Sequence, residues 1–108
     1  MLEPNAAAGF SALGNATRLA IFRVLVQAGD GGCPICAIQN QVDIPLSTLG
    51  HHLQALVRAG LVIQEKSGRE VICTADYCRL NDLVDYLKAN CCAGVPAGDG
   101  ELVDEMAS

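Results

Sequence analysis

The sequence predicts a mainly α-helical domain that carries one small β-hairpin. At 108 residues the chain has the length of a single compact domain. Apolar residues recur with helical spacing in several segments, each bounded by glycine, proline or a capping residue. Near the middle, residues 61–66 and 70–75 are short apolar runs on either side of Ser67-Gly68, which indicates two strands joined by a tight turn.

The first well-defined helix begins at a capping residue, either Asn15 or Thr17, and ends near Gly29. We expect its apolar face to carry Leu19, Phe22, Leu25 and Val26. A glycine-rich loop, 30–32, separates it from a short helix over about 34–42.

A turn follows at 43–45, because a proline drives the residue before it out of the helical conformation. The next helix starts near Ser47 and stops at Gly60, a typical C-terminal residue. After the hairpin, a last helix is expected over about 80–92. Helix, turn, helix and hairpin in this order predict a winged helix-turn-helix domain.

The helix after Pro45 has two distinct faces. Its apolar stripe consists of Leu49, Leu53, Leu56 and Val57. A second stripe of hydrogen-bonding side chains consists of Ser47, His51, Gln54 and Arg58. Such side chains can read base edges or hold phosphates, although a polar stripe alone is also typical of a solvated face. Lys66 and Arg69 flank the hairpin tip, where they serve either solubility or contact with a nucleic-acid backbone.

Charge and composition limit the function classes. The net charge is −5, but it is divided unevenly: −1 over 1–45, +1 over 46–75 and −5 over 76–108. No apolar run long enough for a transmembrane helix and no signal peptide are present, so we expect a cytoplasmic protein without a membrane partner. We divide the chain into an ordered domain, 1–93, and an acidic flexible tail, 94–108. Neither a phosphate loop nor a catalytic triad or carboxylate pair is evident, which argues against an enzyme.

Three segments resemble the ArsR/SmtB family of metal-responsive repressors. Residues 12–25 (ALGNATRLAIFRVL) resemble the second-helix signature of that family. Residues 47–53 (STLGHHL) with 56–62 (LVRAGLV) resemble its recognition helix, and 67–69 (SGR) resemble its wing tip. The resemblance covers about residues 10–94. It implies a homodimer through the first and last helices, which binds double-stranded operator DNA until an effector releases it. The implied DNA-binding residues are Ser47, Thr48, His51, Gln54, Arg58, Lys66 and Arg69.

The effector has to be argued from six cysteines, which in a reducing compartment more often bind a metal or sense redox state than form structural disulfides. In the last helix, Leu80, Leu83, Val84 and Leu87 form an apolar stripe that Cys91 continues. Residues 83–92 (LVDYLKANCC) resemble the helix end of arsenite-responsive family members, in which an Asn-Cys-Cys triplet supplies two thiolates. The resemblance implies trivalent arsenic or antimony, inorganic or methylated, at Cys91 and Cys92, with no organic cofactor. Such members usually add a third cysteine further on, but this chain has none after Cys92. The third ligand is open between Cys33, Cys36 and Cys78 of either chain and a small cellular thiol.

Cys33-Pro34-Ile35-Cys36 is a second thiol motif that can bind metal or form a redox pair. Three alternatives follow from it. A redox- or sulfide-responsive repressor would link Cys36 to Cys91 or Cys92, and a structural zinc site would use both pairs. A CxxC oxidoreductase is disfavoured, because that motif normally follows a βαβ pattern. Cys73 shares a strand face with Val71 and Ala75, which indicates packing, and Cys78 is placed in a loop before the last helix.

Overall fold

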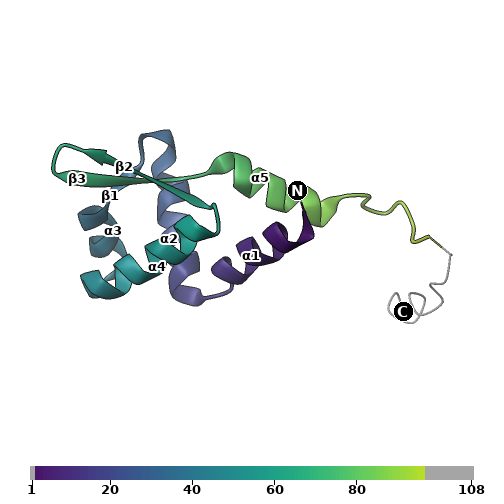
Figure 1. Cartoon of the computed structure of the whole chain (residues 1–108), viewed down its shortest axis with the longest axis horizontal. Helices are drawn as coiled ribbons and strands as arrows, with labels where there is room; N and C mark the ends of the chain where they lie inside the picture. Colours follow the sequence, from purple (N-terminus) through teal and green to yellow (C-terminus); the bar gives the residue numbers. More distant parts are fainter. Residues whose placement is uncertain (1, 97–108) are drawn as a thin grey trace.

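The computed structural model describes residues 2–96. It contains five α-helices and a small three-stranded antiparallel sheet, and this is a winged helix-turn-helix fold (Figure 1). The helices are α1 (Glu3–Leu13), α2 (Ala16–Ala28), α3 (Ile35–Val42), α4 (Leu46–Arg58) and α5 (Tyr77–Lys88). The strands are β1 (Cys33–Pro34), β2 (Val62–Ser67) and β3 (Glu70–Ala75), in the order β1-β3-β2. The predicted fold class is therefore confirmed. Most of the predicted tail, 97–108, lies outside the described residues.

α2 begins where the sequence predicted it. The Asn15 side chain accepts a hydrogen bond from the backbone N–H of Arg18 at 3.1 Å, which satisfies one free donor at the helix N-terminus. The predicted apolar face is correct only in part. Ile21, together with Phe22 and Leu25, is buried, whereas Leu19 and Val26 are exposed, so the buried face is turned by about one residue from the prediction.

α3 and α4 meet at the predicted turn, where Asp43 adopts a left-handed conformation (φ 51°) that ends α3. α4 begins at Leu46, after Pro45, and its predicted stripe packs inward: Leu49, Leu53 and Leu56 are fully buried. Gly60 (φ 79°) follows α4 and lets the chain turn into β2.

The hairpin of β2 and β3 forms the wing. Its register pairs Ser67 with Glu70, which leaves a two-residue turn of Gly68 and Arg69. Gly68 has a positive φ of 63°, as the first turn residue of a type II′ hairpin requires. The sequence did not predict β1, because a two-residue strand that includes a proline carries no alternating pattern. β1 pairs with β3 and attaches the start of α3 to the wing.

α1 and α5 lie side by side and project away from the rest of the domain (Figure 1). They pack closely: a Cβ atom added at Gly9 would lie only 2.9 Å from Cδ1 of Leu83, so there is no room for a side chain at this position unless Leu83 moves. The predicted apolar stripe of the last helix is divided in the structure. Leu83 is buried within the chain, whereas Val84 and Leu87 are 45% and 71% exposed.

The predicted bounds of the last helix were wrong at both ends. α5 starts earlier, because the Asp76 side chain caps it by accepting a hydrogen bond from the backbone N–H of Arg79 at 3.1 Å. Cys78 therefore lies in the first turn of α5 and not in a loop. α5 ends at Lys88, because the backbone of Ala89 leaves the helical conformation (φ −53°, ψ 133°). Asn90 and Cys92 beyond it adopt left-handed conformations (φ 59° and 61°), so the helix does not resume. Cys91 consequently does not continue the apolar stripe.

Candidate functional site

The polar face of α4 points to solvent. Because the leucines at 49, 53 and 56 are buried against the domain, helical geometry turns the opposite side outward. The exposed residues on that side include every α4 position predicted to contact DNA: Ser47, Thr48, His51, Gln54 and Arg58. These side chains supply hydroxyl, amide, imidazole and guanidinium groups, which suffice to contact both base edges and phosphates.

The wing presents two further cations. Lys66 and Arg69 are both exposed, and Arg69 occupies the turn itself. A Cβ atom at Gly68 would meet no other atom within 4 Å, so the tip of the hairpin faces open space. The sequence placed both residues correctly at the hairpin end.

A contact between Arg18 and His52, which was not predicted from the sequence, anchors α4 to α2. The Nε of Arg18, which is half-buried, donates a hydrogen bond to Nδ1 of His52 at 3.1 Å. Burial lowers the pKa of His52, and the Arg18 and His51 side chains lower it further. A neutral imidazole is required here, because a protonated Nδ1 cannot accept this hydrogen bond. The adjacent histidines at 51 and 52 were the sequence feature that could have indicated this contact. Neighbouring residues of a helix point about 100° apart, so only one of the two can lie on the exposed face.

The thiol pair of Cys91 and Cys92 lies just beyond α5. Both side chains are exposed, and the two Sγ atoms are 3.5 Å apart. Two successive turns hold this segment: the N–H of Cys91 donates to the carbonyl of Lys88 at 2.9 Å, and the N–H of Ala93 donates to that of Asn90 at 3.0 Å. The structure therefore brings the two predicted effector ligands together, although in a turn and not in a helix.

Among the described residues of one chain, no third ligand joins this pair. Over residues 2–96, no group of three histidine, cysteine or carboxylate side chains is arranged to hold a metal ion. Cys33 is buried in β1, Cys36 is exposed in α3 and Cys78 is exposed at the start of α5. Figure 1 places β1 and α3 at the opposite end of the molecule from the end of α5. A four-cysteine zinc site within one chain, or a disulfide from Cys36 to the thiol pair, would therefore require a large rearrangement.

Comparisons with known proteins agree with the fold. A family model described as a helix-turn-helix domain matches residues 13–65. The putative arsenical resistance operon repressor ArsR of Halobacterium salinarum is 41% identical over 59 residues, which are 55% of this chain and 45% of that protein. An uncharacterised helix-turn-helix transcriptional regulator of Methanocaldococcus jannaschii is 38% identical over 59 residues, 55% of this chain and 64% of that protein. The matched segment thus spans less than two thirds of either curated relative.

A solved structure extends the similarity to most of the chain. It is the homodimeric winged helix-turn-helix DNA-binding domain of a possible ArsR-family transcriptional regulator from Mycobacterium bovis, with 30% identity and a TM-score of 0.64. The match covers 81% of each chain. In the part of the chain that the structure describes, no helix has the length and apolar character needed to cross a membrane. The chain belongs to the ArsR family of winged helix-turn-helix transcriptional regulators.

Proposed function

We propose that this protein is a homodimeric, DNA-binding transcriptional repressor that trivalent arsenic or antimony releases from its operator by binding to Cys91 and Cys92. The observation that carries the proposal is the pair of exposed thiols 3.5 Å apart at the end of α5. The named relative from Halobacterium salinarum, a putative arsenical resistance operon repressor, supports the choice of effector.

The exposed face of α4 and the wing are the surfaces we assign to DNA. The leucine stripe of α4 packs into the core and leaves the opposite face of the helix on the surface. That face can enter a major groove without disturbing the core. Arg58, Lys66 and Arg69 supply positive charge for the phosphates, whereas Gln54 and His51 offer hydrogen bonds to base edges. The large negative charge of the chain lies after residue 75, away from this surface in sequence.

The exposed apolar side chains of α1 and α5 are the surfaces we assign to the dimer. Leu2, which immediately precedes α1, and Leu87 of α5 are each 71% exposed, and Phe10 of α1 and Val84 of α5 are exposed as well. Water contact at so many large apolar side chains is unfavourable, and a second copy would bury them. The Mycobacterium bovis relative is homodimeric. In such a dimer the two α4 helices would enter successive major grooves about 34 Å apart.

The chemistry of the thiol pair favours a soft ion. Thiolates select soft acceptors, and a metal–sulfur bond of about 2.3 Å allows two ligands of one ion to lie up to about 4.6 Å apart. The separation of 3.5 Å falls within that limit, so both sulfur atoms can bind the same ion. A third bond of arsenic is then available to a thiol of the partner subunit, to a small cellular thiol or, in a methylated arsenical, to carbon.

The position of the pair provides a route from effector to DNA. Cys91 follows Lys88, the last residue of α5, and Leu87 on the same helix belongs to the proposed dimer surface. Ligation that pulls the two thiolates onto one ion would change the end of α5 and so the relative position of the two subunits. A coupling of about 1–3 kcal/mol, which is common for allosteric proteins, would lower DNA affinity roughly 5- to 150-fold.

Equilibrium dialysis with arsenite under reducing conditions, followed by elemental analysis, tests the assignment of the ligands. The wild-type protein is expected to retain one arsenic per chain, and Cys91→Ser and Cys92→Ser are each expected to lose at least tenfold in affinity. Cys73→Ala is the matched control, because it removes a buried thiol. Unchanged arsenic binding in both Cys91→Ser and Cys92→Ser would contradict the proposal.

A further inference from the structure

Two other cysteines face each other across the sheet. Cys33 of β1 and Cys73 of β3 are direct partners in the antiparallel register. Directly opposite residues have Cα atoms about 4.5–5.5 Å apart and side chains on the same face, which lies within the range a disulfide requires. Both residues are buried, with 9% and 0% of their surfaces exposed, and both are present as free thiols.

The backbone around this pair is held unusually close. A Cβ atom at Gly32 would lie 2.6 Å from Cγ2 of Ile72 and 2.8 Å from the carbonyl oxygen of Cys73, so only glycine allows β1 to approach β3 in this way. β1 is two residues long, and its second residue, Pro34, has no N–H to donate to the ladder. The link between the helix-turn-helix and the wing therefore has few hydrogen bonds of its own.

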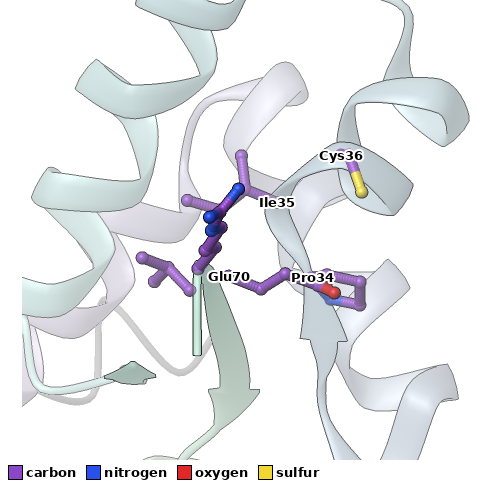
Figure 2. Close-up of a pocket in the computed structure, with 6 residues that line it drawn as sticks. Pro34, Ile35, Cys36 and Glu70 are labelled. Carbon is purple, nitrogen blue, oxygen red and sulfur yellow. The ribbon is translucent and has the colours of Figure 1, made fainter. Parts of the chain in front are cut away.

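A third thiol, that of Cys36, is exposed to solvent and lies close to Cys33 in the chain. Cys36 is exposed in the first turn of α3, three residues after Cys33 (Figure 2). It lines a surface cavity of about 250 Å³ together with Pro34, Ile35, Arg69, Glu70 and Val71. The cavity leaves room for a small molecule beside Cys36, and it is lined by one cationic side chain, Arg69, and one anionic side chain, Glu70.

We propose that Cys33, Cys36 and Cys73 form a redox site in which a low-molecular-weight disulfide, such as glutathione disulfide, reacts first at Cys36 and leaves a disulfide between Cys33 and Cys73. The site is separate from the thiol pair at the end of α5 and does not depend on its proposed role. The product joins the helix-turn-helix covalently to the wing.

The reaction consists of three thiol–disulfide exchanges. The Cys36 thiolate attacks one sulfur of glutathione disulfide and expels a glutathione thiolate. Cys33 then attacks the Cys36 sulfur and expels the second glutathione, and Cys73 attacks the Cys33 sulfur and releases Cys36 as a thiolate. In total, Cys33 and Cys73 lose two protons and two electrons, and glutathione disulfide is reduced to two glutathione molecules.

Burial explains why the exposed thiol is needed. Burial raises the pKa of the Cys33 thiol, and the neighbouring Cys36 raises it further. Burial also raises the pKa of Cys73, although a hydrogen bond from Gln64 at 3.6 Å acts in the opposite direction. Because the thiolate is the attacking species, both buried thiols react slowly with a disulfide in solution. Cys36 does not share this burial.

The test uses the full chain with Cys78, Cys91 and Cys92 replaced by serine, all three being exposed positions. Trypsin then places Cys33 and Cys36 in peptide 24–58 and Cys73 in peptide 70–79. After incubation with glutathione disulfide, non-reducing mass spectrometry is expected to find these two peptides linked. The melting temperature is expected to rise by roughly 5–15 °C, since the bond closes a loop of about 40 residues.

Two further variants of that protein identify the linkage. Adding Cys36→Ser should preserve the linked peptides but slow their formation at least tenfold, whereas adding Cys33→Ala should abolish them. The proposal is overturned if the oxidised protein contains only a Cys33–Cys36 disulfide or glutathione adducts. It is also overturned if the linked peptides persist without Cys33, because Cys36 would then be the partner of Cys73.

Discussion

Gly9 in α1 provides a test of how tightly α5 is held against the domain. Replacement of a helical glycine by alanine stabilises a helix by about 1 kcal/mol. At Gly9, however, the added Cβ would lie 2.9 Å from Cδ1 of Leu83, which is 1% exposed. Overpacking of a buried site costs about 1–3 kcal/mol. Gly9→Ala should therefore leave the free energy of unfolding unchanged or lower it by up to about 2 kcal/mol.

Gly50 in α4 is the matched control, because a Cβ there would meet nothing within 4 Å. Gly50→Ala should raise the free energy of unfolding by about 1 kcal/mol, so the two variants should differ by about 1–3 kcal/mol. Urea unfolding with linear extrapolation, at equal protein concentrations, measures both values. Equal stabilisation by the two substitutions would refute the close packing of α1 on α5.

Three further predictions concern DNA contact, the dimer and pH. Arg58→Ala should weaken binding to selected and random duplexes alike and reduce the slope of log affinity against log salt concentration by about one. Gln54→Ala should instead cost about 1–3 kcal/mol of sequence preference. Fluorescence anisotropy measures both effects, and wild-type binding by both variants would contradict the assignment of α4 to DNA. Leu87→Glu should give a folded monomer in analytical ultracentrifugation, since this side chain is 71% exposed in the single chain, and a stable dimer would place the interface elsewhere. Because the pKa of His52 is lowered in the folded protein, its contribution to stability should be complete above the unfolded value of about 6.5 and decrease as the pH falls below it. His52→Gln should reduce this loss in urea unfolding at pH 5 to 7.5, and an unaltered pH dependence would show that the contact with Arg18 does not control it.

The sequence predicted α4 and the wing well because their signals are local. A leucine stripe at helical spacing, a stop at Gly60 and a turn at Gly68 each define an element without reference to the rest of the chain. The polar residues assigned to DNA are accordingly exposed in the structure. Their contact with DNA remains a prediction.

The end of α5 and the strand β1 depend on contacts and conformations that the sequence pattern does not reveal. Periodicity extended the last helix to Cys92, but left-handed residues at 90 and 92 turn the chain and bring the two thiols together. β1 exists only because Gly32 permits its approach to β3, which is distant in sequence. Similarly, the sequence alone could not show which apolar residues of α5 are buried within the chain and which are exposed, because this depends on where α1 packs.

Release of DNA by arsenite tests the proposed function most directly. The probe is a labelled duplex that the wild-type protein has selected from a random pool, and fluorescence anisotropy follows its dissociation as arsenite is added under reducing conditions. Wild-type protein and Cys73→Ala should release the duplex, with an affinity loss of roughly 5- to 150-fold. Cys91→Ser and Cys92→Ser should bind the duplex normally and stay bound at the same arsenite concentrations. If both serine variants release the duplex as the wild-type protein does, the effector does not act through the thiol pair at the end of α5.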